Sequence, residues 1–275
     1  VKSKQKPELV IHLTDVQDLY GEQNLASTTL FAGGFINFGY WKNLKLEPKI
    51  SKNTRALSSG KLYEKIFNLL DVNEKDTVLE VGCGLGNGCV MLHKKHNPKY
   101  IIGIDSSYKQ IQRTHRKQRS YLVKNKDSIK FAVAEAENLQ IPNGSISKIF
   151  SVEALQHFIS LDCFLDSAFK AMKCGGSLVV TTFLFRSEPS QKFMDLFPNF
   201  ASGVDKIIKL NDFLKKLKMH GFIDIKSRSI GKDVWPGFDK WISQTEYKDT
   251  WDKNWIQAYR DKIIDYYTVE AKKPI

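Results

Sequence analysis

The sequence predicts an α/β fold with a doubly wound sheet of mainly parallel strands and helices on both faces. Three observations lead to this prediction. Between residues 77 and 185, short apolar runs alternate with helical patterns, which is typical of consecutive βαβ units. The first run leads into a glycine-rich turn, and an acidic residue lies at or beside the end of each of the first three runs. Polar groups at neighbouring strand ends are typical of Rossmann-like sheets.

The individual elements follow from hydrophobic period and from helix start and stop signals. Runs rich in Val, Ile and Phe predict strands, and a 3.6-residue period between them predicts helices. Asp162 is a candidate N-cap, and Gly175 and Gly176 end the helix that follows it. The predicted strands are residues 77–81, 100–105, 129–134, 146–152, 177–185, 223–229 and 265–271, and the predicted helices are residues 86–96, 107–124, 162–172 and 211–220.

Three segments lie outside this alternation, namely residues 1–50, 186–210 and 230–262. The last of them contains four of the five tryptophans of the chain. Ligands of open α/β sheets bind beyond the carboxyl ends of the strands. We therefore expect these three segments to cover that end of the sheet.

Composition narrows the class of protein. No window approaches the roughly 20 apolar residues of a membrane span, and no signal peptide is evident, so a cytoplasmic protein is expected. The four cysteines show neither a C-x-x-C pair nor a zinc spacing, which indicates reduced thiols and no metal site. The net charge is +12, and its densest patch, at residues 109–126, is read as the solvated face of a helix.

The glycine-rich turn spans residues 82–87 and reads G-C-G-L-G-N. Its glycines let a ligand approach the backbone closely. A dinucleotide fingerprint would need a glycine at position 87, which is Asn87, and no P-loop pattern is present. Glu80, just before the turn, would repel a pyrophosphate. A carboxylate there suits a ligand with an ammonium and a sulfonium group, such as S-adenosylmethionine.

Two further carboxylates fit the same ligand. Asp105 ends the second predicted strand and can accept hydrogen bonds from both ribose hydroxyls. Glu135 follows the third predicted strand and is placed to accept from the adenine amino group. Each carboxylate alone could be an ordinary strand-end residue. Together with the glycine turn, the three favour a nucleoside site.

On these runs the sequence resembles the class I S-adenosylmethionine-dependent methyltransferases. The matching runs are V-L-E-V-G-C-G-L-G, I-G-I-D-S, A-E-A-E-N-L, S-V-E-A-L-Q-H and C-G-G-S-L-V-V, within residues 60–185. The resemblance implies seven strands with the last antiparallel, and residues 265–274 match that strand. It implies S-adenosylmethionine as cofactor and S-adenosylhomocysteine as product. The implied contacts are Glu80, Gly82, Gly84 and Gly86 at the methionine end, Asp105 with Ser106 at the ribose, Glu135 with Ala136 at the adenine, and Glu153 beside the cofactor.

A narrower resemblance lies in the amino-terminal stretch. Y-G-E at 20–22 and F-I-N-F-G-Y-W at 35–41 resemble the lid of microbial small-molecule O- and N-methyltransferases. It implies that Tyr20 contacts the cofactor and that Phe38, Tyr40 and Trp41 close over the acceptor; the alternative is that these aromatics are core residues. The chain then divides into a lid (1–50), a cofactor-binding half (55–185), cap insertions with the substrate half (186–262) and a final strand (263–275).

His157 is the predicted general base. It lies five residues beyond the fourth predicted strand, where the methyl group should be, and a neutral imidazole has a suitable pKa for deprotonating an alcohol. The resembling enzymes have a base at this place. The alternative is a structural histidine beneath the cap.

The function predicted is O-methylation of a small molecule, which the positive charge suggests is anionic or lipid-like. Two other functions are kept open. The net charge favours an RNA methyltransferase, although the [DN]-P-P-[YF] motif of adenine-methylating enzymes is absent after the fourth predicted strand. The third is a non-catalytic S-adenosylmethionine-binding protein. The sequence does not decide the oligomeric state, and a homodimer is compatible with it.

Overall fold

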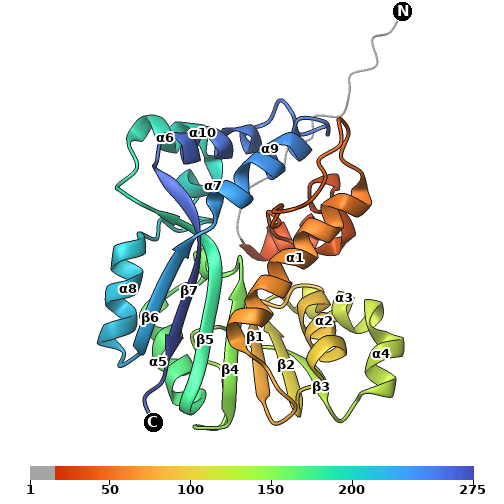
Figure 1. Cartoon of the computed structure of the whole chain (residues 1–275), viewed down its shortest axis with the longest axis vertical. Coiled ribbons are helices and arrows are strands. Elements are labelled where there is room, and N and C mark those ends of the chain that lie inside the picture. Colours follow the sequence, from red (N-terminus) through yellow and green to blue (C-terminus); the bar gives the residue numbers. More distant parts are fainter. Residues whose placement is uncertain (1–15) are drawn as a thin grey trace, which may run out of the picture.

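A computed structural model of the chain describes residues 16–275 and contains a seven-stranded sheet with helices on both faces (Figure 1). The strand order is β3-β2-β1-β4-β5-β7-β6. Strands β1 to β5 pair in parallel, whereas β7 pairs antiparallel with both β5 and β6. The doubly wound α/β sheet and its reversed last strand are thereby confirmed.

The strands and helices that were predicted lie close to their predicted ranges, whereas no helix was predicted for α1, α6, α7, α9 or α10. The strands are β1 (Thr77–Val81), β2 (Tyr100–Asp105), β3 (Ile129–Val133), β4 (Ile146–Val152), β5 (Met172–Phe185), β6 (Ile223–Ser229) and β7 (Ile264–Lys272). The helices are α1 (Lys52–Leu70), α2 (Asn87–His96), α3 (Tyr108–Lys117), α4 (Arg119–Lys124), α5 (Leu161–Ala171), α6 (Gln191–Leu196), α7 (Pro198–Ala201), α8 (Leu210–Met219), α9 (Trp235–Ile242) and α10 (Asn254–Arg260). Short helical turns are η1 (Asp18–Glu22), η2 (Leu25–Ser27), η3 (Thr29–Gly34), η4 (Leu155–His157), η5 (Gly231–Asp233) and η6 (Trp251–Lys253).

Three predicted boundaries need correction. The helix predicted over 107–124 is two helices, because Gln118 leaves the helical region with φ −96° and ψ 6°. The N-cap of α5 is Ser160 and not Asp162, since the Ser160 hydroxyl accepts from the backbone N–H of Cys163. That helix ends at Ala171, and β5 begins directly afterwards instead of at residue 177.

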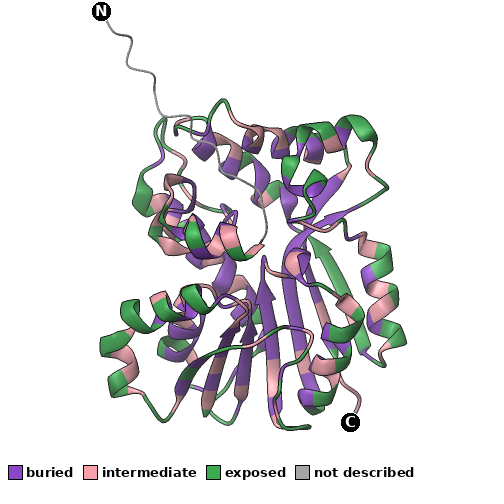
Figure 2. Cartoon of the chain, turned by 180° about the vertical axis from the view of Figure 1, so that it is seen from behind, coloured by how far each residue is buried: buried purple, intermediate pink, exposed green. Residues whose placement is uncertain are grey.

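The inner strands β1, β4, β5 and β7 are buried on both faces, whereas the edge strand β6 is mostly exposed (Figure 2). On β1, Val78 packs in the cluster that contains Leu62 of α1 and Leu92 of α2. Its neighbour Leu79 packs in the opposite cluster, with Phe164 of α5. Successive strand residues point to opposite faces, so two apolar layers explain why the parallel strands read as continuous apolar runs.

The segments outside the βαβ pattern lie beyond the carboxyl ends of the parallel strands. In Figure 1, α6, α7, α9 and α10 form a cap at the top of the sheet, next to the amino-terminal turns. The cap is held by aromatic packing, in which Trp235 and Trp255 stack with ring centroids 5.5 Å apart. Phe38 of the amino-terminal stretch packs against both rings. The cap and this stretch therefore share one core.

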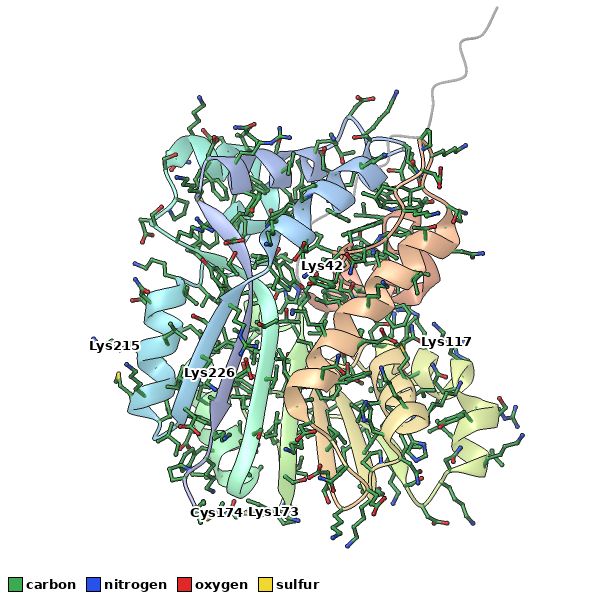
Figure 3. The ribbon with its side chains drawn as sticks, in the orientation of Figure 1. Lys42, Lys117, Lys173, Cys174, Lys215 and Lys226 are labelled. Carbon is green, nitrogen blue, oxygen red and sulfur yellow. The ribbon has the colours of Figure 1, made fainter. Side chains whose placement is uncertain are left out.

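The excess lysines are distributed over the molecule. Figure 3 labels Lys42, Lys117, Lys173, Lys215 and Lys226, which are exposed and lie on separate elements around the chain. The basic side of α3 is only partly a solvated face, because some of its cations bind the lid as described below. Within residues 16–275, no helix is long and apolar enough to cross a bilayer.

Candidate active site

The first cavity opens at the carboxyl ends of the strands, where the strand order reverses between β1 and β4. It encloses about 910 Å³ of empty space, part of it open to solvent. Its walls come from the ends of β1, β2, β3 and β4, and from the lid. This position matches the ligand-binding crevice of doubly wound sheets.

The glycines of the predicted turn have different roles. Gly84 has φ +51° and open space where a Cβ would stand, so its backbone is exposed to the cavity. Gly82 also lines the cavity, and a Cβ there would lie 2.3 Å from Cβ of Ala154. Gly86 lies outside the lining. It is the N-cap of α2 and has a left-handed φ of +69°, and a Cβ there would collide with Phe131.

Asp105 and Ser106 line the cavity at the end of β2. The Asp105 carboxylate accepts from the backbone N–H groups of Gly84 and Ser107, each at 2.9 Å. Burial raises the pKa of this carboxyl, although the two N–H groups oppose the shift. A carboxylate has about four lone-pair positions, so it can still accept from a ligand diol. A hydrogen bond thus connects the glycine turn to Asp105, the residue predicted to bind the ribose.

The end of β3 forms the next part of the wall. Glu135 lines the cavity and is exposed, and Ala136 lines it and is buried. Gln110 of α3 also lines it with 1% of its surface exposed, and neither its Oε1 nor its Nε2 has a hydrogen-bond partner in the described chain. A buried amide without partners fits a polar ligand in this cavity. The sequence analysis did not select Gln110.

Glu80 does not line the cavity, which corrects its expected contact with the methionine end. It is fully buried under the glycine turn, and it accepts from the hydroxyl of Tyr63 at 3.0 Å and the thiol of Cys89 at 2.9 Å. Burial raises the pKa of its carboxyl to about 7. Its position indicates that Glu80 supports the turn from behind.

A second cavity of about 600 Å³ adjoins the first. The two share Tyr20, Ile36, Glu153 and His157 as lining residues. The rest of its wall comes from the amino-terminal turns, β5 and the cap. Two molecules, one bound in each cavity, would therefore meet at these four side chains.

His157 is held at this junction by groups that fix its tautomer. Its Nδ1 lies 3.0 Å from the carbonyl oxygen of Val204 and 3.2 Å from Oδ1 of Asp205. A carbonyl oxygen only accepts, so the contact with Val204 places a hydrogen on Nδ1. In neutral His157, Nε2 is then an acceptor, and the hydroxyl of Tyr20 donates to it over 2.7 Å. Burial, followed by nearby carboxylates, raises the pKa of Tyr20, which keeps this donor protonated.

Glu153 lies at the same junction and has a strained backbone with φ +50°. Its Oε1 accepts from the backbone N–H of Phe38 at 2.6 Å and from the hydroxyl of Tyr266. Burial raises the pKa of this carboxyl to about 8, against the effect of these donors and of Arg55. The geometry connects Glu153 to the amino-terminal stretch as well as to the cavity walls.

The predicted lid aromatics divide into two groups. Phe38 lines the second cavity. Tyr40 and Trp41 line neither cavity, which corrects their expected contact with the acceptor. The Tyr40 hydroxyl donates to Asp233 at 3.3 Å, and Trp41 is 5% exposed, with its indole N–H donating to the carbonyl of Phe38. Trp41 thus holds the backbone of Phe38, and Tyr40 binds the cap at Asp233.

The lid turn η1 is bound to α3. The guanidinium of Arg113 donates to the carbonyls of Tyr20 and Gly21, at 2.7 and 2.5 Å. Lys109 pairs with Glu22. These contacts place Tyr20 over both cavities. Residues 1–15 of the expected lid lie outside the described part of the chain.

Asp205 and Asp252 complete the second cavity and were not selected from the sequence. They lie in segments without a recognisable motif, 48 and 95 residues after His157. The only feature of the sequence that could have selected them is that each is an acidic residue in a segment expected to cover the sheet. Over residues 16–275, no group of three or more His, Cys, Asp or Glu side chains is arranged to hold a metal ion.

The fold and the site define a class of protein, the methyltransferases with a seven-stranded α/β sheet. The profile of a family described as a methyltransferase domain matches residues 72–249, which is more than half of the chain. The chain belongs to this family and is an S-adenosylmethionine-dependent methyltransferase.

Two curated relatives are named as methyltransferases. The erythromycin 3''-O-methyltransferase of Saccharopolyspora erythraea is 24% identical over 83% of this chain and 74% of its own length. The 27-O-demethylrifamycin SV methyltransferase of Amycolatopsis mediterranei is 22% identical over 76% of this chain and 74% of its own.

Solved structures share the fold. The geranyl diphosphate C-methyltransferase of Streptomyces coelicolor A3(2), in complex with Mg2+, geranyl diphosphate and S-adenosyl-L-homocysteine, has a TM-score of 0.76. It is 18% identical, with 86% of this chain and 90% of that chain covered. The cyclase SpnF has a TM-score of 0.74 and 20% identity, with 96% and 97% covered. At these identities the likeness establishes the fold.

Proposed function

We propose that this enzyme methylates a hydroxyl group of a small molecule and that His157 is the general base. The observation that carries the proposal is the His157 site, where Nδ1 is held by Val204 and Asp205 and Nε2 faces the junction of two cavities. A base must lie within hydrogen-bond reach of the proton that it removes. The junction is the place where a methyl donor and an acceptor would meet.

The first cavity fits S-adenosylmethionine. The exposed backbone at Gly82 and Gly84 would hold the methionine end, and the Asp105 carboxylate would accept from the ribose hydroxyls. Ala136 offers an apolar surface to the adenine, with Glu135 as acceptor for its amino group. The two unpartnered amide atoms of Gln110 support the presence of a polar ligand here. When bound, the cofactor supplies the electrophilic methyl group.

The acceptor hydroxyl would take the place of the Tyr20 hydroxyl at Nε2 of His157. As the new carbon–oxygen bond forms and the methyl–sulfur bond breaks, the hydroxyl proton passes to Nε2. The resulting imidazolium is stabilised by Asp205 beside Nδ1. S-adenosylhomocysteine leaves as the second product. Tyr20 covers the junction, which limits the access of water.

The test is His157→Ala, assayed with acceptors found by screening hydroxylated compounds against methyl-labelled S-adenosylmethionine. We expect kcat to fall by about 100-fold or more, because general-base catalysis contributes 10²–10⁴-fold. Calorimetry should give an unchanged Kd for S-adenosylhomocysteine. The matched control is His115→Ala on the exposed side of α3. Near-full turnover in the His157 variant would refute the base assignment.

C-methylation is the second candidate. The second cavity contains the aromatic rings of Phe38, Phe183 and Trp255, which can stabilise a cation formed when an alkene is methylated. Two proteins with this fold are named a C-methyltransferase and a cyclase. NMR of the product shows whether the labelled methyl group is bound to oxygen or to carbon. A bond to carbon would support C-methylation over O-methylation.

A further inference from the structure

We propose that the second cavity selects a largely hydrophobic acceptor that carries no negative charge and presents a second hydrogen-bond donor, a hydroxyl or an ammonium group, to Asp252. This inference rests on the proposed function for the position of the reacting hydroxyl at His157. It adds the chemical class of the acceptor and a residue that determines specificity.

The wall of the second cavity is mainly apolar. Because each apolar surface that a ligand covers is removed from water, such a wall favours hydrophobic molecules. Three flat rings, those of Phe183, Trp251 and Trp255, offer faces on which a planar ring system can stack. The apolar lining residues are Leu19, Leu25, Leu30, Phe31, Ile36, Phe38, Phe183, Val204, Trp251 and Trp255.

The charges of the lining exclude an anionic acceptor. The titratable side chains are Tyr20, Glu153, His157, Asp205 and Asp252, and no Lys or Arg of the described chain lines this cavity. A phosphate or carboxylate would lose its hydration there and face carboxyl groups without a cation. The structure of the geranyl diphosphate enzyme contains Mg2+ together with its substrate, whereas residues 16–275 contain no cluster of three or more His, Cys, Asp or Glu side chains that could hold a metal ion. The anionic acceptor suggested by the net charge is therefore not part of the proposal.

Two buried polar side chains in the lining call for hydrogen-bond donors. Asp252 is 5% exposed, and its Oδ2 accepts from the Thr250 hydroxyl at 2.8 Å. Asn199 is 2% exposed, and its Nδ2 donates to Oδ2 of Asp205 at 2.6 Å. The Asp205 carboxylate fixes the orientation of this amide, so Oδ1 of Asn199 is left without a partner among the described residues.

Asp252 is the group that can recognise a donor on the acceptor. It lies on η6 of the cap, whereas His157 lies on η4 below, and its hydrogen bond runs to Thr250 and not to the His157 site. Burial raises the pKa of Asp252 to about 6, so it is mainly ionised at neutral pH. A buried carboxylate next to apolar rings is stabilised by a ligand hydroxyl or, more strongly, by an ammonium group.

The experiment uses four 2-naphthols that differ only at carbon 6, where they carry methyl, hydroxymethyl, aminomethyl or carboxylate. Binding to the full chain saturated with S-adenosylhomocysteine is measured by calorimetry at pH 7.5. We expect the hydroxymethyl and aminomethyl compounds to bind about tenfold more tightly than the methyl compound, because one hydrogen bond contributes about that factor. The carboxylate should bind at least tenfold more weakly than the methyl compound.

Two variants assign the preference to Asp252. Asp252→Leu should remove the advantage of both donors while leaving the methyl compound unchanged. Asp252→Asn should keep the hydroxymethyl advantage and lose most of the aminomethyl advantage, because the amide oxygen still accepts but carries no charge. The matched control is Asp249→Leu, at an exposed position three residues away. If Asp252→Leu does not fold, the order of the four compounds on the unmodified chain still decides.

Three results would overturn the inference: a carboxylate that binds as well as the methyl compound, donor preferences that survive in Asp252→Leu, or no binding of any naphthol to protein that binds S-adenosylhomocysteine. Failure to bind S-adenosylhomocysteine itself is a different result. It would refute the proposed function, and this inference with it.

Discussion

The two cavities are built in different ways. Most of the first cavity comes from residues within a few positions of a strand end, such as Gly84 after β1, Asp105 at the end of β2 and Ala136 after β3. The second cavity is assembled from turns far apart in the chain, including η1, η4 and η6. Sheet topology alone brings the first set together, whereas the second set depends on how the cap folds. The first cavity, the proposed cofactor site, thus follows from the fold. The second cavity, the proposed acceptor site, depends on the particular sequence of the cap.

The largest effect that separates the two cavities is expected for Asp105→Asn. The amide group cannot accept from both backbone N–H groups and from a ligand diol, so one end of it would face donors. Losing charge-assisted hydrogen bonds of about 1.5–3 kcal/mol predicts a roughly 100-fold increase in the Kd of S-adenosylhomocysteine.

Calorimetry checks this prediction, with Asp127→Asn at an exposed position as the control. The affinity for naphthol probes, measured without cofactor, should be unchanged. An unaltered cofactor Kd in the Asp105 variant would mean that the ribose is bound elsewhere.

Asp205→Asn is expected to act in the opposite way, on turnover and not on cofactor binding. The variant loses the negative charge beside Nδ1 of His157 that stabilises the imidazolium. Because the Val204 carbonyl still holds the tautomer, we expect a loss in kcat of about tenfold, less than for removal of His157 itself. Asp195→Asn, exposed on α6, is the control. A cofactor Kd that rises in parallel with the loss in kcat would contradict this separation of the two sites.

The same contrast explains what the sequence could predict. The seven strands and the acidic residues Asp105 and Glu135 follow from short patterns at or beside each strand, whereas the reversal of β7 and the place of Ala136 followed from the resemblance to class I methyltransferases. Glu80 belongs to such a motif but points beneath the turn, because alternate strand residues point to opposite faces and the pattern does not specify which face carries the ligand.

The acceptor side could not be derived in the same way. Asp205 reaches His157 only because α7 and the turn after it fold back over η4, and no local pattern encodes that contact. Tyr40 and Trp41 belong to the same aromatic run as Phe38, yet only Phe38 lines the cavity. Composition identified the run, but tertiary packing decided which ring faces the ligand.

Arg113→Ala tests whether α3 couples the two cavities. It removes both hydrogen bonds that hold the backbone of η1, so Tyr20 loses its fixed place at the junction. We expect the KM for S-adenosylmethionine to rise and kcat to fall, each about threefold to tenfold, since each bond contributes about 1 kcal/mol. Arg116→Ala, an exposed position on the same helix, should behave as the unmodified chain in steady-state kinetics. Equal effects of the two variants would show that Arg113 acts only through its positive charge and not through its hydrogen bonds to η1.

The effect expected for Glu153, which lines both cavities, concerns stability, and no effect is expected on the separation of the two cavities. Burial raises the pKa of this carboxyl to about 8 in the folded protein, above the ordinary value of 4.5 that applies when the chain is unfolded. Below pH 4.5 the group is protonated in both states, and its contribution to stability is fully present. As pH rises toward 8, the unfolded chain releases the proton first, so the contribution decreases by about 1.4 kcal/mol per pH unit at most. The decrease ends once the folded carboxyl ionises as well.

Glu153→Gln has no proton to release and keeps an oxygen that can accept from Phe38 N–H. Its Tm should therefore fall less than that of the unmodified chain between pH 5 and pH 8, by up to about 10 °C in calorimetric scans. Glu80 and Asp252 have raised pKa values of about 7 and 6 and shift stability in the same direction, but they do so in both proteins and cancel in the difference. Glu74→Gln, at an exposed site, is the control. Parallel curves of Tm against pH would show that Glu153 is ionised in the folded protein at neutral pH, and that Arg55 offsets its burial.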